Sequence, residues 1–389
     1  LGASLLMAYL NRWEKFPHWL LKDSMRSIPV ANGALGMGCI GYPGHPAWEV
    51  TSACNLSCIH CHAASEKPNT DDLSTKEAKR FIDDLREVSE FRTIVYTGGE
   101  PLVRNDIFEL LGHSQQAGFA NIIATNGTLI DDEMAFKLKE HGVVCNAISL
   151  DAADPEVHNF IRNDPRAFDL VMRGIEATKK AGILLQINTT AMEHNLPHLS
   201  DLIPFVDEMG ANIMLMYQLV AVGRGQKIAE ATLKKKANRD LCELISEMQR
   251  GVQTIIEPVA GPQYWPYLLE KRSIDERWLK IAEKVFHGCA AGRGFVYIKS
   301  NGDVWPCPFV EVTAGNVRER SFREIYEDSE VFVNLRNREK TLKGDCGICK
   351  YRTICGGCRG RAWAYSGDYL AEDPRCFIKG ERGPSEPVA

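Results

Sequence analysis

The chain has 389 residues, of which 44% are hydrophobic and 25% charged, and its net charge is −5. This length exceeds that of one ordinary domain, so we expect about two. A net negative chain without a long basic patch excludes a protein that wraps nucleic acid. Thirteen cysteines are many for a chain of this size. Because disulfide frameworks belong mostly to short secreted chains, these cysteines indicate bound metal.

The first 46 residues predict a separate lead-in. Residues 5–21 are rich in Leu, Trp, Phe, Met and Tyr, and the Gly/Pro-rich stretch 33–46 follows. We expect a helix docked on the domain. The alternative is a lipid-facing or substrate-facing element that makes a peripheral membrane contact. The apolar run is about half of the roughly 20 residues that a bilayer span needs, and it shows no signal peptide. We therefore expect a cytoplasmic protein, with membrane association as the alternative.

From residue 47 onward, short apolar runs alternate with amphipathic stretches. Ser74 and Glu77 form a capping box at the first helix start, and Gly118 and Gly142 follow helices as C-terminal caps do. Alternating strands and helices predict a parallel sheet, either open and doubly wound or an incomplete barrel, with chemistry at the C-terminal strand ends. The expected strands are 47–51, 93–96, 121–125, 144–150, 184–189 and 213–219, and the expected helices are 75–89, 107–117, 132–141, 168–181 and 199–209.

The pattern changes beyond residue 225. We expect a helical linker over 226–288, with helices near 239–250 and 275–286. Cysteine and glycine dominate 289–380, which predicts a second, cluster-binding region. Residues 381–389 form a tail.

Three cysteines follow the first strand directly. Cys54, Cys58 and Cys61 have the spacing C-x3-C-x2-C. Three thiolates can hold three irons of a [4Fe–4S] cluster and leave the fourth iron open for a ligand. A zinc site completed by His60 or His62 is the alternative, because structural zinc normally takes four ligands.

A glycine pair ends the second strand, in the run Thr97-Gly98-Gly99-Glu100-Pro101. Two glycines let the backbone approach a ligand, and a carboxylate can meet an ammonium group. Together with the three cysteines, this run resembles the radical S-adenosylmethionine (SAM) superfamily. The resemblance implies an incomplete (β/α)6 TIM-like barrel in which Gly98, Gly99, Glu100 and Pro101 bind SAM through its amino group.

Other strand ends match the same superfamily more loosely. The resemblance implies that Ser149, Arg162 and Asn188 hold the SAM carboxylate and ribose, and that Leu219 and Val220 line the adenine pocket. Each of these residues has an alternative role as a structural strand end or cap. Further candidates at strand ends are Thr125, Asn126 and Asp151.

The C-terminal cysteines resemble the SPASM extension, an auxiliary iron–sulfur domain, although one interval is a residue shorter than the family's pattern. The resemblance implies two auxiliary [4Fe–4S] clusters. Cys346, Cys349, Cys355 and Cys376 would ligate the distal cluster. Cys289, Cys307 and Cys358 would ligate the nearer one, whose fourth ligand stays open. A zinc ribbon over residues 346–358 is the alternative.

Three cysteines belong to neither set. We expect Cys145 and Cys242 to be small buried hydrophobes, and Cys39 is an outside candidate for the missing ligand.

Two C-terminal runs, 355–361 and 367–374, and the segment 219–225 resemble radical SAM proteins that modify haem side chains. The leading hypothesis is therefore oxidative modification of a tetrapyrrole side chain, of the haem-branch decarboxylation type. In it, Arg224, Arg359 and Arg361 meet propionates, with ordinary ion-pair use as the alternative. The resemblance also implies a reduced flavodoxin or ferredoxin as electron donor and an anaerobic organism.

Three alternatives remain from the sequence. The apolar lead-in motivates radical carbon–carbon bond formation on an archaeal membrane lipid. Similar motifs occur in maturases of ribosomal peptides and cofactors. An iron–sulfur electron carrier is the non-enzymatic alternative, but a carrier closes its clusters with four cysteines and needs no SAM pocket.

Overall fold

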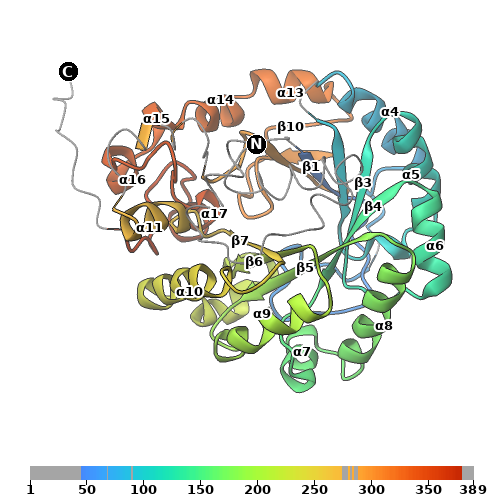
Figure 1. The fold of residues 1–389 in the computed structure, drawn as a ribbon. Coiled ribbons are helices and arrows are strands. Elements are labelled where there is room, and N and C mark those ends of the chain that lie inside the picture. Colours follow the sequence, from blue (N-terminus) through green and yellow to red (C-terminus); the bar gives the residue numbers. More distant parts are fainter. Residues whose placement is uncertain are drawn as a thin grey trace.

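The computed structural model describes residues 45–378, apart from residues 68, 89–90, 274–278, 281–282 and 284–287. One curved ten-stranded sheet runs through this part of the chain, in the order β10-β9-β8-β1-β2-β3-β4-β5-β6-β7 (Figure 1). The strands are β1 (His45–Glu49), β2 (Thr93–Thr97), β3 (Ala120–Thr125), β4 (Val143–Ser149), β5 (Leu184–Ala191), β6 (Ile213–Gln218), β7 (Ile255–Val259), β8 (Phe295–Ile298), β9 (Asp303–Trp305) and β10 (Gly315–Asn316).

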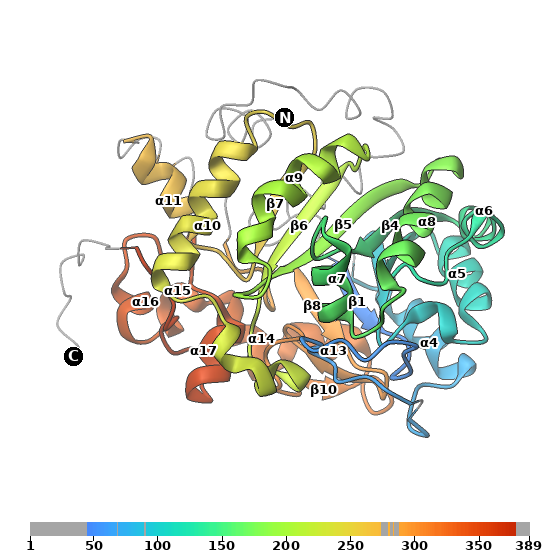
Figure 2. The same ribbon diagram turned by 90° about the horizontal axis from the view of Figure 1, so that it is seen from below.

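The first six strands and the helices between them confirm the predicted alternation and the α/β barrel-like class. Helices cover the outer side of this sheet, as Figures 1 and 2 show. They are α4 (Thr75–Leu85), α5 (Ile107–Gln116), α6 (Asp132–Glu140), α7 (Pro155–Arg162), α8 (Ala167–Lys180) and α9 (Leu199–Glu208), with short 3-10 helices at Pro101–Val103, Leu196–His198 and Gly223–Ala231. Ser74 and Glu77 form the predicted capping box of α4.

The sheet is larger than the six strands predicted. β7 lies in the expected helical linker and pairs in parallel with β6. β8 comes from the C-terminal region and pairs in parallel with β1, and β9 and β10 continue the sheet in antiparallel fashion. The barrel and the C-terminal region therefore share one sheet. The expected helix at 275–286 falls largely outside the described residues, as do 1–44, the tail and Cys39.

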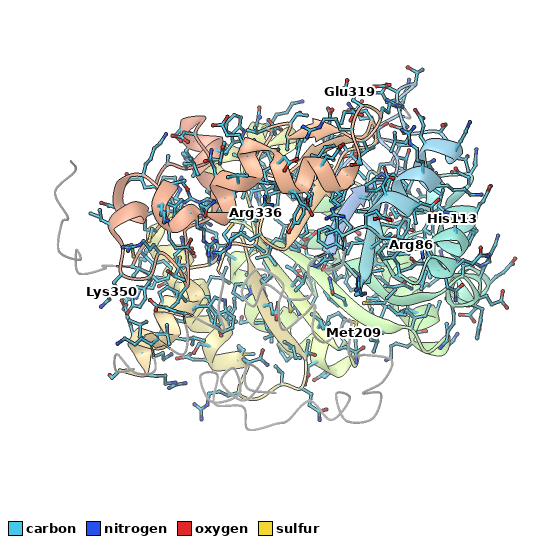
Figure 3. The ribbon with its side chains drawn as sticks, turned by 90° about the horizontal axis from the view of Figure 1, so that it is seen from above. Arg86, His113, Met209, Glu319, Arg336 and Lys350 are labelled. Carbon is cyan, nitrogen blue, oxygen red and sulfur yellow. The ribbon has the colours of Figure 1, made fainter. Side chains whose placement is uncertain are left out.

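The linker and C-terminal helices lie beyond the two ends of the barrel sheet (Figures 1 and 2). They are α10 (Lys235–Met248), α11 (Tyr264–Lys271), α13 (Phe322–Asp328), α14 (Glu330–Arg336), α15 (Arg338–Thr341), α16 (Gly344–Ile348) and α17 (Arg359–Ser366). Arg336, labelled in Figure 3, joins α14 to the end of α13 by donating to the carbonyls of Tyr326 and Glu327 at 2.5 and 2.6 Å. Positive charge at a helix C-terminus stabilises it.

Two layers of apolar side chains fill the fold. The larger cluster packs the outer face of the sheet against the helices and continues into α13 and α14 through Phe322 and Phe332. A smaller cluster fills the inside of the barrel below the strand ends, with Ile122, Cys145 and Leu215 among its buried members. Within the described residues, no helix combines the length and apolar character that crossing a membrane requires.

Candidate active site

A cavity opens at the C-terminal ends of the barrel strands, where the sequence predicted the chemistry. All three cysteines of the first motif line it, and so do most of the candidate SAM-binding residues. The lining candidates are Cys54, Cys58, Cys61, Gly98, Gly99, Thr125, Asn126, Ser149, Arg162, Asn188, Leu219 and Val220. Three candidates, Glu100, Pro101 and Asp151, do not line it and lie behind its wall.

The loop that carries the three cysteines is held from several sides. Ile59 N donates to Ile161 O at 3.1 Å. Arg224, which follows β6, donates from its backbone N to Cys61 O at 2.9 Å and from its side chain to Cys58 O and Ser65 O, each at 2.9 Å. These contacts fix the loop before any cofactor binds.

The glycine pair after β2 lies against this loop. A Cβ at Gly99 would stand 1.9 Å from Ala53 O and 3.0 Å from the Cβ of Cys54. Gly98 has a φ of +143°, and a Cβ there would stand 2.5 Å from Thr51 O. Only glycine permits this close approach, so the pair is what lets β2 end directly beside the cysteine loop.

The sequence led us to expect the Glu100 carboxylate in the cavity, but Glu100 does not line it. Its side chain is fully buried, and its carboxylate accepts hydrogen bonds from Thr125 Oγ1 at 2.9 Å, Asn126 N at 2.8 Å and Leu102 N at 3.2 Å. Burial raises the pKa of Glu100 to about 7 against the effect of these donors. The carboxylate thus positions the ends of β2 and β3, and the backbone of the glycines faces the cavity.

Asp151 and Arg162 form a buried ion pair behind the cysteines. Asp151 Oδ2 and Arg162 Nε lie 2.8 Å apart, and Asp151 Oδ1 accepts from Thr190 N at 3.0 Å. Arg162 NH1 lies 3.8 Å from Cys58 Sγ. Its positive charge favours the thiolate form of Cys58, although burial raises the pKa of that thiol overall.

The strand ends bring the remaining candidates together in register. Ser149 on β4 pairs with Asn188 on β5, and Asn188 Oδ1 accepts a hydrogen bond from Gln186 at 2.8 Å. Because paired residues of a parallel sheet face the same side, this register turns both side chains into the cavity.

Two of the C-terminal cysteines, Cys307 and Cys355, each have other cysteine thiols nearby. Burial raises the pKa of Cys307 well above its usual range, and the nearby thiols of Cys289 and Cys358 add to this effect. The pKa of Cys355 is raised in the same way by burial and then by Cys376 and its other neighbours, Cys346 and Cys349. Cys145 and Cys242 lie fully buried elsewhere.

Backbone N–H groups point at several of these sulfurs, which tests whether they suit a cluster. Three cysteines accept from the residue two positions later at 3.4 Å: Cys54 from Leu56, Cys349 from Tyr351 and Cys355 from Gly357. Such bonds stabilise anionic sulfur and tune iron–sulfur clusters. Within the described chain, no three Cys, His, Asp or Glu side chains converge as ligands of one metal ion. The N–H donors at Cys54, Cys349 and Cys355 suit thiolate ligands of iron–sulfur clusters, in which each cysteine binds a different iron.

Three arginines expected at substrate propionates have other partners. Arg224 binds the cysteine loop as described above. Arg359 is fully buried, donates to Tyr369 O at 2.9 Å and lies 3.6 Å from Cys346 Sγ. Arg361 pairs with Asp373 at 2.8 Å. Arg361 thus takes part in an ion pair, as the alternative expected, whereas Arg359 and Arg224 donate to backbone carbonyls, and Arg224 also lines the cavity.

One wall of the cavity consists of residues that the sequence did not single out. It combines His45 on β1, Gln186 on β5, Tyr217 on β6, Phe295 and Tyr297 on β8, and Pro308 with Phe309 after β9. These residues alternate with outward-facing ones in their strands, but their convergence depends on β8 pairing with β1. No local pattern carries that information.

Comparison with known proteins agrees with this geometry. The radical SAM superfamily model matches residues 48–203, and the SPASM iron–sulfur cluster-binding domain model matches residues 289–350. The AdoMet-dependent heme synthase of Methanosarcina barkeri is 38% identical over 338 residues, or 86% of this chain and 96% of the relative. The protein of the same name from Oleidesulfovibrio alaskensis is 35% identical over 92% of this chain and 95% of its own.

Among solved structures, Streptococcus suis SuiB bound to S-adenosylmethionine has a TM-score of 0.69. Its identity is 19%, and the match covers 97% of this chain and 88% of that one, so the likeness concerns the fold alone. The two domain models and the full-length relatives lead to one conclusion: the chain belongs to the radical SAM superfamily and is a radical SAM enzyme with a SPASM iron–sulfur domain.

Proposed function

We propose that this enzyme oxidatively decarboxylates propionate side chains of a tetrapyrrole in a haem branch. The observation that carries the proposal is the 38% identity to an AdoMet-dependent heme synthase across 96% of that relative's length. The match also covers 86% of this chain, which is far more than the radical SAM region at residues 48–203 alone.

The reaction removes one hydrogen atom and one electron from each propionate. The carbon–carbon bond to the carboxylate breaks, CO2 leaves, and a vinyl group remains. The hydrogen atom ends on 5′-deoxyadenosine, and the electron passes to a one-electron acceptor. One further electron is spent on cleaving each SAM, and we propose a reduced flavodoxin or ferredoxin as its source.

We assign the residues to roles by their positions. Cys54, Cys58 and Cys61 would hold the catalytic cluster, which together with SAM supplies the hydrogen-abstracting radical. The backbone of Gly98 and Gly99 would meet the SAM amino group. The other lining candidates, Thr125, Asn126, Ser149, Arg162, Asn188, Leu219 and Val220, would bind the rest of SAM. Glu100, Pro101 and Asp151 would position these residues from behind.

The cavity wall that the sequence did not predict offers a surface for the substrate. Phe295, Tyr297 and Phe309 offer apolar ring area to a flat macrocycle, and Gln186 and Tyr217 offer polar atoms beside it. The wall lies in the same cavity as the three cysteines, so a side chain of a bound macrocycle faces the site of hydrogen abstraction. Enclosure by these residues also keeps water away from a radical.

A direct assay tests the proposal. The anaerobically reconstituted full chain is incubated with SAM, a reductant and iron coproporphyrin. The expected product has lost CO2 and two hydrogen atoms per propionate, about 46 mass units each, in step with the release of 5′-deoxyadenosine. Deoxyadenosine release without any change in the tetrapyrrole would contradict the substrate and leave the radical chemistry standing.

The lipid alternative depends on residues 1–46, nearly all of which lie outside the described residues. A second arm of the assay therefore offers lipid vesicles in place of the tetrapyrrole. Product on that arm, with none on the first, would replace the proposal by the lipid reaction.

A further inference from the structure

A second buried ion pair, Arg361 with Asp373, lies between the active-site cavity and the auxiliary cysteines. Arg361 donates to the two Asp373 oxygens at 3.0 and 2.8 Å, and the side chains are only 3% and 0% exposed. Gln263 closes the arrangement, since its amide donates to Asp373 at 2.6 Å and accepts from Arg361 at 3.0 Å. With these partners satisfied, the pair is held in one orientation.

The same pair touches both groups of auxiliary cysteines. Arg361 N donates to Cys358 Sγ at 3.4 Å, and Cys358 N donates to Asp373 Oδ2 at 2.8 Å. Asp373 N donates to Cys346 Sγ at 3.4 Å. Cys358 belongs to the nearer group and Cys346 to the distal group, so the ion pair lies against one ligand candidate of each.

The other end of the arrangement reaches the cavity. Gln218, the last residue of β6, lines the cavity, and its Oε1 accepts a hydrogen bond from Arg361 NH1. Its Nε2 donates to Asn238 Oδ1 at 2.7 Å. Gly261 leaves the space that this amide fills, because a Cβ there would stand 2.7 Å from Gln218 Nε2.

We propose that Gln218, Arg361 and Asp373 form a charge bridge that positions Cys358 and sets the reduction potential of the nearer auxiliary cluster from the wall of the active-site cavity. Charge and hydrogen bonding around the sulfurs are what tune such clusters. The positive charge of Arg361 favours the reduced cluster, which carries one more electron, and the negative charge of Asp373 opposes it. The three residues act as positioning residues through Cys358. The inference depends on the SPASM domain and not on the identity of the substrate.

The test is an EPR-monitored redox titration of the full chain. A background with Cys54, Cys58 and Cys61 all changed to alanine removes the signal of the catalytic cluster. Arg361→Gln should lower the potential of the nearer cluster, and Asp373→Asn should raise it. Each shift should reach a tenfold change in the reduction equilibrium, which is about 59 mV for one electron.

Two variants separate charge from structure. Arg361→Lys keeps the charge and should stay closer to the parent potential than Arg361→Gln, whereas a merely structural role would make both behave alike. Arg318→Gln is the matched control, because Arg318 ties the C-terminal region to the barrel through Glu77 and Asp71, both at 2.8 Å, and its side chain donates only to oxygen atoms among the described residues. It should leave the potential unchanged.

A separate part of the experiment tests the connection to the cavity through Gln218. Gln218→Leu removes the acceptor of Arg361, and Gly261→Ala displaces the Gln218 amide without touching Arg361. Both should shift the spectrum of the nearer cluster by less than Arg361→Gln does, with iron content retained. Unchanged spectra in both would refute the connection to the cavity. Shifts of the same sign, or none, in Arg361→Gln and Asp373→Asn would overturn the whole proposal.

Discussion

Asp151 and Arg162 form an ion pair in which Oδ2 and Nε lie 2.8 Å apart, with side-chain exposures of 0% and 9%. The pair joins the end of β4 to the end of α7, directly behind Cys58. Arg162 therefore has two roles: it neutralises the buried Asp151 carboxylate, and it faces the Cys58 thiol of the catalytic loop.

Arg162→Gln should therefore destabilise the chain strongly. Removing one partner leaves a buried charge uncompensated, which typically costs about 3–5 kcal/mol. Urea unfolding and iron content measure the loss, and Asp151→Asn together with Arg162→Gln should recover part of the stability. The control is Arg166→Gln, which breaks an exposed pair with Asp164 at 3.2 Å and should behave like the parent. If Arg162→Gln were as stable as Arg166→Gln, the buried ion pair would not have the stabilising role assigned to it.

Glu100→Gln should weaken SAM binding although the side chain never faces the cavity. A carboxamide has one acceptor oxygen, so its NH2 group must face either Asn126 N or the donors Thr125 Oγ1 and Leu102 N. An unsatisfied buried donor costs about 1–3 kcal/mol, or roughly 5- to 150-fold in affinity if the loop moves with it. Titration of the SAM-induced change in the EPR spectrum measures this. Thr125→Val, which removes a single donor, should have a smaller effect.

Gly99→Ala should prevent the catalytic cluster from assembling. Its Cβ would stand 1.9 Å from Ala53 O, a backbone atom that cannot move without the cysteine loop. Of about twelve irons expected from three clusters, about four should be missing. Gly112→Ala in α5 is the control, since the nearest atom to its Cβ would be 3.9 Å away. Full iron content in Gly99→Ala would show that the loop yields more easily than its contacts indicate.

Glu257→Gln should stabilise the chain increasingly as the pH rises. Glu257 pairs in register with Leu215 inside the barrel, and neither of its carboxylate oxygens has a hydrogen-bond partner among the described residues. Burial raises its pKa well above the usual 4.5. Above pH 4.5 the unfolded chain loses this proton while the folded chain keeps it, so the parent loses stability by up to about 1.4 kcal/mol per pH unit.

The variant carries no such proton, so the difference from the parent should be smallest near pH 4.5 and grow until the folded carboxyl ionises. Urea unfolding at pH 5, 6 and 7 measures it. Glu109→Gln, at a side chain that is 55% exposed, should show no comparable trend. A flat difference for Glu257→Gln would mean that the carboxyl is already ionised in the folded barrel.

The same Glu257 explains one limit of prediction from the sequence. The first six strands were recognisable as short, mostly apolar runs that alternate with amphipathic helices. β7 reads Ile-Ile-Glu-Pro-Val, and the charge and the proline hide it. Proline is tolerated because β7 is the edge strand of the sheet.

The site divides in the same way. Local spacing was enough to predict the loop of Cys54, Cys58 and Cys61 and the glycine pair, since each lies within one short stretch of chain. The direction of Glu100 and the partners of Arg361 were not predictable, because they depend on side chains of β3, β6 and the segment near Asp373. Residues that far apart in sequence are brought together only by the register of the sheet.

The pairing of β8 with β1 sets the order in which the molecule can be completed. On a ribosome that makes roughly 5–20 residues per second, residues 295–298 emerge some ten seconds to a minute after His45–Glu49. Until then one edge of β1 has no partner, and unpaired edges invite aggregation. The barrel strands alone therefore leave open an edge of β1 that β8 covers in the full chain. Chains that end before β8 keep this edge exposed, so we expect chaperones and proteases to recognise them.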